Sequence, residues 1–441
     1  MKHWNKTRWG NLYYAGLYKL FESMRDVKRF LNSLSFNFRL VTGEINPVDF
    51  IGIEALRVFL PEVYRKIANN KDLFTAVRMD SNQQNPLTEK KNSLDRIFDS
   101  NPDQSEIAKN ICMELFPQIR AVYPKLFTGT WSGNPASWRK ERRICSEDVF
   151  DIYFVLGVPM GEVSREELQQ FITIADQPDQ LINLLRTYKE QGRIARLLDW
   201  LNDIVEELSK EGILGLCQAL LQFGDELANI QKGILGPGTD IQLPWIISQL
   251  LRRIEDPKSR FDWLLDQINK GNSFFTVIQQ VSWHIPSQAE PIPDPIFDSQ
   301  QLSILTNSCV KKISSYAKSG DLLKTKNLVY VLFRWKEWAK DAKAISSFIN
   351  RTISSPNSAL DFLTGFIWET GSYTFGDYVE KKEWDIDKKS LVALADIEKL
   401  TSSLLALHKN KESNLSEKEQ LALKLFFEKI VDKQDKRKLA S

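Results

Sequence analysis

The chain has 441 residues, of which 42% are hydrophobic and 26% are charged. These shares are ordinary for folded, water-soluble proteins, and the length exceeds what one hydrophobic core organises, so two or three units are expected. The 59 basic and 57 acidic residues leave a net charge of +2, which excludes a strong global attraction to nucleic acid or to anionic membranes.

The spacing of the cysteines and the hydropathy of the chain indicate in which cellular compartment the protein is expected. Cys112, Cys145, Cys217 and Cys309 lie far apart and form no CxxC pair. A zinc site would need closely spaced pairs of ligands, and a secreted protein held together by disulfides would have more cysteines. We therefore expect reduced, mostly buried thiols in a cytoplasmic protein. The N-terminal residues lack the apolar core of a signal peptide. The longest apolar stretch, 212–223, falls short of the roughly 20 residues that span a bilayer, so no membrane crossing is expected.

The first forty residues predict one long helix. Its apolar positions recur at alternating spacings of four and three, which is one face of a helix. These positions are Tyr13, Leu17, Leu20, Met24, Val27, Leu31 and Leu34. Arg25, Lys28, Arg29 and Asn32 follow helical spacing on a different face and predict a narrow basic stripe.

Helix-start signals follow. Asn46 is a good N-cap, and Pro47 suits the first helical position behind it. Pro61 ends that helix or begins the next. The segment 146–148 (Ser-Glu-Asp) predicts another start, and Ser164 with Glu167 three residues later forms the pattern of a capping box.

The fold expected is all-α, an array of two or three packed helical units. Polar and Gly/Pro-rich breaks divide the chain into 1–78, 79–128, 129–235 and 236–441, with the second segment containing an exposed polar excursion at 79–105.

The C-terminal segment shows a faint internal similarity between 256–264 and 355–363, which extends to Ile268 and Ile367. It indicates either stacked helical-hairpin repeats or two helices that begin alike with proline at the first position. A single match is not a period, so the second interpretation is favoured.

Complete catalytic motifs are absent from the sequence. No Gly-x-x-x-x-Gly-Lys-Ser/Thr loop is present to hold a triphosphate, and the apolar run 152–156 ends in Gly157 rather than in a metal-binding Asp. The three histidines have no mutual ligand spacing, and neither His-Glu-x-x-His nor Gly-x-Ser-x-Gly occurs. The chain is therefore expected to carry no complete active site.

One short basic cluster follows Trp138 and consists of Arg139, Lys140, Arg142 and Arg143. Clustered cations beside an aromatic residue can contact the phosphates of nucleic acid. Four cations within five positions make a small electrostatic footprint, however, so a solvated surface is the favoured interpretation.

Three segments carry a family resemblance. Residues 24–34, 44–50 and 54–64, in this order over about forty residues, resemble the part of the KAP family of P-loop NTPases that follows the nucleotide-binding core. A weaker likeness continues at 142–154 and 158–164. The resemblance covers roughly the first half of the chain. It implies that residues 1–78 form a helical, lid-like region. It indicates no function for the residues beyond about 235.

This resemblance implies a whole protein that hydrolyses ATP with magnesium, uses helical regions to sense or transmit the nucleotide state, and in bacteria often serves in defence against phage. The chain departs from the family because both Walker segments are absent. The resemblance therefore implies a helical regulatory or effector portion without ATPase activity of its own, whose NTPase core lies on the same or a neighbouring polypeptide.

Within this interpretation, Arg25, Lys28 and Arg29 are the candidate sensor residues, because a guanidinium stays protonated and donates a rigid fork to phosphate. The plainer alternative is that they form surface ion pairs with Asp26 or Glu22. For the whole chain, the alternatives are a stand-alone helical scaffold that binds protein partners through aromatic grooves, and a nucleic-acid-binding helical module.

Overall fold

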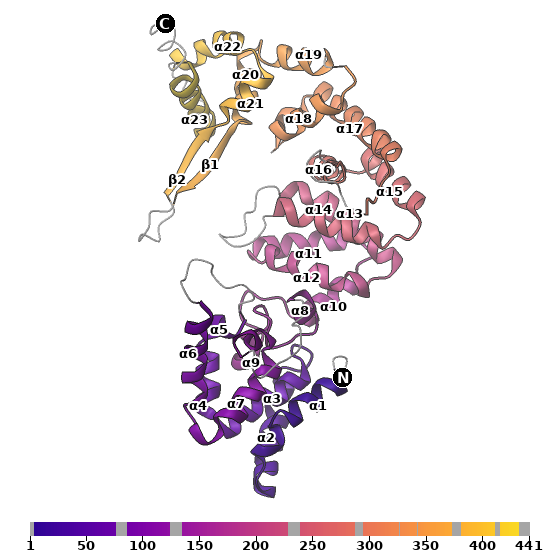
Figure 1. The fold of residues 1–441 in the computed structure, drawn as a ribbon. Coiled ribbons are helices and arrows are strands. Elements are labelled where there is room, and N and C mark those ends of the chain that lie inside the picture. The colour runs from indigo at the N-terminus through magenta and orange to yellow at the C-terminus, as the bar shows by residue number, and fades with distance from the viewer. Residues whose placement is uncertain are drawn as a thin grey trace. The chain divides into compact units, whose positions relative to one another are not determined.

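The computed structural model is predominantly helical and confirms the all-α expectation (Figure 1). It describes residues 4–75, 86–123, 135–227, 239–286, 294–325, 327–341, 343–372, 381–410 and 415–431. Contacts divide the chain into two compact units. Unit 1 contains residues 1–173 and 188–206, and unit 2 contains residues 174–187 and 207–441. The expected break at Gly236 lies outside the described residues.

Unit 1 is built from short helices. In chain order they are α1 (Lys6–Tyr14), η1 (Leu17–Leu20), α2 (Met24–Leu40), α3 (Pro47–Phe59), α4 (Pro61–Ala68), α5 (Lys71–Thr75), α6 (Pro86–Phe98), η2 (Pro102–Gln104), α7 (Ser105–Leu115), η3 (Pro117–Val122), α8 (Pro135–Lys140), α9 (Ile152–Val155), α10 (Arg165–Thr173) and α12 (Ile194–Ile204), followed by η5 (Val205–Glu207). The η elements of this unit are 3-10 turns.

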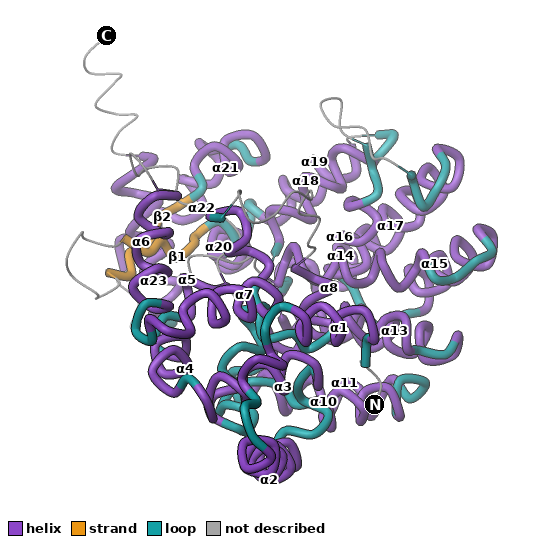
Figure 2. Tube along the Cα trace, turned by 60° about the horizontal axis from the view of Figure 1, so that its bottom comes forward, coloured by secondary structure: helices purple, strands orange, loops and turns teal. Residues whose placement is uncertain are grey.

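Helix α3 is the centre of unit 1, where it contacts α1, α2, α4 and α7 (Figures 1 and 2). Its start confirms the sequence signal, because the Asn46 side chain accepts hydrogen bonds from the backbone N–H groups of Val48 at 3.1 Å and Asp49 at 3.4 Å. The capping box of Ser164 and Glu167 is also confirmed, with bonds of 2.8 and 3.1 Å. Pro61 begins α4.

The expected long helix across residues 13–34 is wrong. Helix α1 ends at Tyr14, Gly16 follows with a φ of 138°, and α2 begins anew behind a capping box of Ser23 and Asp26. The break shifts the helical phase, so Met24 and Leu31, expected inside, are 71% and 52% exposed.

Two further expectations fail in unit 1. Ser146 starts no α-helix directly, since the described helix there begins at Ile152. The polar segment 86–98 is not an exposed excursion, because it forms α6, which contacts α4 and α7 and buries Leu94 and Phe98. Residues 79–85 lie outside the described part of the chain.

Helix α11 (Pro178–Glu190) begins in residues assigned to unit 2 and ends in residues assigned to unit 1. The remaining elements belong to unit 2. They are α13 (Lys210–Leu227), α14 (Thr239–Arg252), α15 (Pro257–Lys270), α16 (Phe275–Trp283), α17 (Ser299–Ser319), the 3-10 turn η6 (Asp321–Lys324), α18 (Leu328–Trp338), α19 (Lys343–Thr352), α20 (Pro356–Thr364), β1 (Ile367–Ser372), β2 (Lys381–Ile386), α21 (Lys388–Leu394), α22 (Ile397–Asn410), α23 (Glu417–Phe426) and the π-helical turn η7 (Phe427–Val431).

Neighbours in sequence are also neighbours in space within unit 2. Helix α13 contacts α14 and α16, α17 contacts α15 and α18, and α20 contacts α22 and α23. The helices follow one another along a curved path from α13 to the β1–β2 hairpin (Figure 1). Packing of this local kind is typical of helical arrays, in which each layer buries its apolar face against the next.

The internal similarity proves to be a shared helix start. Helices α15 and α20 both begin with proline. The Asp256 side chain caps α15, whereas Ser355 makes no such bond to α20. The match then breaks, since Ile268 lies inside α15 and Ile367 begins β1.

Candidate functional site

Exposed apolar side chains of unit 1 concentrate in its first forty residues. Most of the large ones in the described part of this unit lie there, and the exceptions are Leu87, Val155 and Met160. We call the following set, with the exposed cations of α2, the N-terminal surface. Its apolar members are Trp4, Tyr13, Tyr14, Tyr18, Met24, Leu31, Phe36 and Leu40. Concentrated exposed apolar area is a recognised property of interaction sites.

Ring contacts link three members of this surface, Trp4, Tyr13 and Tyr18, with the half-buried Trp9 lying between the first two. Ring centroids are 5.6 Å apart for Trp4 and Trp9, 5.8 Å for Trp9 and Tyr13, and 5.6 Å for Tyr13 and Tyr18. Trp9 and Tyr13 are four residues apart on α1, so the helix itself places them on one face. Tyr14, which meets Tyr13 edge-on, is 78% exposed.

Helix α2 adds positive charge to the N-terminal surface. Arg25, Lys28, Arg29 and Arg39 are all exposed, and Asp26 is the only acidic residue within the helix. That carboxylate is already engaged, because it accepts hydrogen bonds from the Ser23 hydroxyl at 2.8 Å and backbone N–H at 3.0 Å. The bond from the Ser23 side chain is the main reason why the pKa of Asp26 is lowered.

The candidate sensor residues thus share one exposed face. Arg29 lies 3.8 Å from Asp26 and 5.0 Å from the centroid of the Phe59 ring. Within the described residues, neither Arg25 nor Lys28 forms an ion pair. The ion-pair alternative therefore accounts for Arg29 alone, and only through a long contact.

Helix α2 is held to α3 by a cluster of side-chain hydrogen bonds around Glu54. Glu54, which is 2% exposed, accepts hydrogen bonds from the Ser33 hydroxyl at 2.6 Å and the Asn37 amide at 3.0 Å. Arg57 donates to the same carboxylate at 2.7 and 2.8 Å. These bonds lower the pKa of Glu54 although its burial opposes them, and they fix which face of α2 is presented outward.

The basic cluster at 139–143 is engaged with acidic residues of its own unit. Arg139 donates to Asp203 at 2.6 and 2.9 Å, and Lys140 pairs with Glu206. The favoured solvated interpretation is wrong for Arg142 and Arg143, which are 1% and 6% exposed. A nucleic-acid phosphate could not reach either guanidinium in this conformation.

Arg142 has an unusual environment. Its backbone is left-handed, with a φ of 54°, a conformation that is uncommon outside glycine. The guanidinium contacts Glu44 at 3.1 Å and lies 4.3 Å from the Trp200 ring, and its burial lowers its pKa. The Arg142 carbonyl accepts hydrogen bonds from the Tyr153 hydroxyl at 2.7 Å and the Asn46 N–H at 2.9 Å.

Arg143 completes a buried ion pair with Asp49. The Arg143 Nε donates to Asp49 at 3.3 Å, while the Ile144 N–H and the Arg8 guanidinium donate to the same carboxylate. Asp49 is fully buried. Sequence patterns gave no sign of this pairing, because its members are 94 residues apart. The cluster therefore ties residues 139–144 to α3 and α12.

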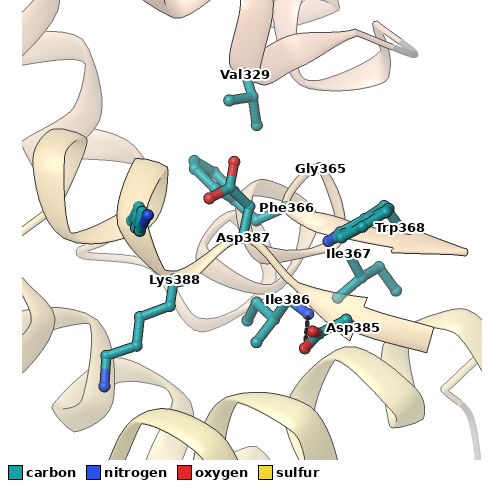
Figure 3. Close-up of a pocket in the computed structure, with 10 residues that line it drawn as sticks. Val329, Gly365, Phe366, Ile367, Trp368, Asp385, Ile386, Asp387 and Lys388 are labelled. Carbon is teal, nitrogen blue, oxygen red and sulfur yellow. Dashed lines mark hydrogen bonds between the residues drawn. The ribbon is translucent and has the colours of Figure 1, made fainter. Parts of the chain in front are cut away.

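Unit 2 contains a hollow of about 570 Å³ between the start of α18 and the foot of the hairpin (Figure 3). Its lining combines apolar and aromatic residues with two aspartates and two lysines. The lining residues are Val329, Gly365, Phe366, Ile367, Trp368, Asp385, Ile386, Asp387, Lys388 and Lys389.

Our sequence interpretation missed this hairpin. A usable signal existed, because Gly376-Asp377 separates two segments rich in aromatic and β-branched residues, which is a hairpin pattern. The foot of the hairpin is closely packed, since a Cβ at Gly365 would lie 2.9 Å from Leu328 Cδ2 of α18.

All four cysteines are free and buried, as expected. Among the described residues, no group of three or more His, Cys, Asp or Glu could hold a metal ion. No helix in this part of the chain is long and apolar enough to cross a membrane. Comparison with protein families, with characterised proteins and with solved structures found no match to this chain.

Proposed function

We propose that this chain is a helical regulatory or effector portion of a KAP-type ATPase, which binds the NTPase core through the N-terminal surface. The observation that carries the proposal is the charge on α2. Arg25 and Lys28 have no acidic partner in the described residues, and the acid nearest to Arg29 is occupied by Ser23. A partner that offers phosphate or carboxylate oxygens would supply the missing counter-charges.

The surrounding aromatic and aliphatic side chains support the same proposal. Tyr14, Met24 and Phe36 are each more than two-thirds exposed, and an interface typically buries aromatic residues, Met and Arg at its centre. Arg25 and Arg29 are proposed to reach the nucleotide of the partner, where a fork of donors stabilises charge on the transferring phosphoryl group.

The test is reconstitution of ATPase activity. The chain is co-expressed with the product of the adjacent upstream reading frame, and both co-purification and phosphate release are measured. The variant Arg25→Ala/Arg29→Ala should fold normally, because exposed charges contribute about 0–1 kcal/mol each to stability. Its turnover should fall about 100-fold or more, as expected for loss of a transition-state contact. Replacement of Arg25 by Lys instead of Ala should recover little of the lost turnover, because an ammonium group does not reproduce the bidentate fork of a guanidinium.

A matched control is Arg65→Ala/Lys91→Ala. It removes the same charge from two exposed ion pairs of unit 1 and should leave turnover unchanged. Unchanged turnover in the Arg25→Ala/Arg29→Ala variant would remove the sensor role. Micromolar, magnesium-dependent ATP binding by the isolated chain, measured by calorimetry, would contradict the proposal that this portion is non-catalytic.

The second candidate function is a helical scaffold for protein partners. It is favoured by the layered helices of unit 2, which expose Trp245 and Trp283 by 43% and 40%, and by strand β1, which exposes Trp368 by 54%. The same co-purification discriminates between the two functions. A scaffold should retain its partners after Arg25→Ala/Arg29→Ala and should not require an ATPase among them.

A further inference from the structure

Residues 4–18 expose a row of aromatic rings along α1 and η1. We call Trp4, Trp9, Tyr13 and Tyr18 the aromatic row, in which successive ring centroids are 5.6, 5.8 and 5.6 Å apart. Trp4, Tyr13 and Tyr18 are 38%, 39% and 43% exposed, so each of these rings keeps part of its surface open to a ligand.

The aromatic row lies on a helix that is held firmly to unit 1. Arg8 donates hydrogen bonds from α1 to the buried carboxylate of Asp49. Lys6, Trp9 and Tyr13 follow the i, i+3, i+7 spacing of a different face of the same helix. The two rings and the ammonium group are therefore arranged before a ligand arrives, which lowers the entropy that binding costs.

Positive charge is concentrated in the same part of the chain. Residues 4–43 contain seven Lys or Arg and two Asp or Glu, a net charge of +5, whereas the whole chain carries +2. Six of the seven cations are exposed, and among the described residues a single contact of 3.8 Å pairs one of them with an acid. Lys19 lies 5.8 Å from the centroid of the Tyr18 ring. The six exposed cations are Lys6, Lys19, Arg25, Lys28, Arg29 and Arg39.

We propose that the aromatic row binds single-stranded nucleic acid, whose bases stack on the rings and whose phosphates contact Lys6 and Lys19. Unpaired bases stack on Trp and Tyr rings with little regard to sequence, and neighbouring cations neutralise the backbone. This proposal goes beyond the ATPase role and uses other residues, because Arg25 and Arg29 of α2 stay assigned to the nucleotide of the NTPase core.

Two other polyanions fit the aromatic row less well. An acidic protein segment offers carboxylates but no flat group to cover each ring. A membrane-binding helix buries a broad apolar face that includes aliphatic side chains, and no large aliphatic side chain is exposed between residues 4 and 23. Nucleotides supply both a flat base and a phosphate at each step of the strand.

The test measures fluorescence anisotropy of labelled oligo(dT) and oligo(U), each of about 20 nucleotides, with the full chain. Binding of either strand supports the proposal. Tyr13→Ala/Tyr18→Ala should weaken it at least tenfold, whereas Tyr13→Phe/Tyr18→Phe should preserve it, because a phenyl ring still stacks. Lys6→Glu/Lys19→Glu should also weaken binding at least tenfold and reduce its salt dependence, because fewer phosphates are neutralised.

The matched control is Arg65→Glu/Arg96→Glu, which should bind as well as the unchanged chain. It reverses two exposed cations on α4 and α6, which lie away from α1 in unit 1 (Figures 1 and 2). Far-ultraviolet circular dichroism confirms that each variant is folded. A duplex of the same length should bind more weakly than the single strand, because paired bases are not free to stack on the rings.

The proposal is overturned if neither oligonucleotide binds, if the duplex binds equally well, or if Tyr13→Ala/Tyr18→Ala binds unchanged. Sedimentation with phosphatidylserine vesicles in the absence of oligonucleotide binding would instead assign the row to a membrane surface. Arg25 and Arg29 are present in every variant and no ATPase is needed, so these results do not depend on the ATPase proposal.

Discussion

His284 is a buried histidine that must stay neutral in the folded protein. It is 5% exposed, and its Nε2 lies 3.0 Å from the Gln280 amide nitrogen and 3.3 Å from the Ser248 hydroxyl. Burial, with the nearby positive charges of Arg252 and Arg260, lowers the pKa of His284 to about 4. A proton added at Nε2 would face the Gln280 amide donor at 3.0 Å, with the more distant Ser248 hydroxyl as its acceptor.

This environment predicts acid lability of unit 2. Because the folded pKa is depressed, the stabilising contribution is complete above the unfolded pKa of about 6.5 and is lost as the pH falls toward 4. The difference corresponds to about 3 kcal/mol of unfolding free energy. Urea titrations between pH 7 and pH 4 should show this loss. The variant His284→Gln should lack it, and an equal slope in both proteins would contradict the assignment.

At the scale of single elements, α13 depends on having no side chain at Gly215. A Cβ at this position would lie 2.2 Å from the Ala175 carbonyl oxygen and 2.9 Å from Asp176 Cα. Both are backbone atoms, so a rotamer change cannot relieve the overlap. Helix α13 therefore passes directly over the turn at 174–177.

Gly215→Ala should consequently destabilise unit 2 by about 1–3 kcal/mol, the usual cost of overpacking. Gly10→Ala is the contrasting substitution, because a Cβ there meets nothing within 4 Å in α1. It should stabilise unit 1 by about 0.5–1 kcal/mol through helix propensity. Thermal melting followed by circular dichroism measures both changes, and a neutral Gly215→Ala would show that α13 can move away from the turn.

Local capping signals were sufficient to predict several helix starts, since Asn46 and Ser164 bond to residues two or three positions away. The assumption of one helix across residues 13–34 failed because apolar spacing was counted through Gly16, where the phase is lost. The pattern Ser23-x-x-Asp26 would have placed the new start correctly. The Arg143–Asp49 pair could not be predicted, because its residues meet only after the chain folds.

At the scale of the whole molecule, the chain completes unit 1 only after contributing residues 174–187 to unit 2. Helix α12 then supplies Asp203 to Arg139, Arg196 to Asp148 and Glu162, and the Trp200 ring to Arg142. Removal of α12 would leave Arg139, Asp148 and Glu162 without these partners, and the buried guanidinium of Arg142 would lose the Trp200 ring. Charges that are buried without partners destabilise the folded state.

A fragment of residues 1–206 should therefore fold cooperatively, whereas a fragment of residues 1–173 should not. Circular dichroism melts and limited proteolysis of the two fragments distinguish these outcomes. A sharp melt of fragment 1–173 at the same temperature as fragment 1–206 would show that α12 is dispensable.

The buried thiols have a practical consequence. Cys112 and Cys145 lie in unit 1, and Cys217 and Cys309 lie in unit 2. Burial raises the pKa of Cys145 and Cys309 to about 12 and shifts the other two in the same direction. The reactive thiolate is thus almost absent at neutral pH while a unit stays closed. A buried cysteine reacts with an alkylating reagent only when its unit opens. The alkylation rates of the four cysteines, resolved by mass spectrometry, would therefore measure the opening rate of each unit separately in one unmodified chain.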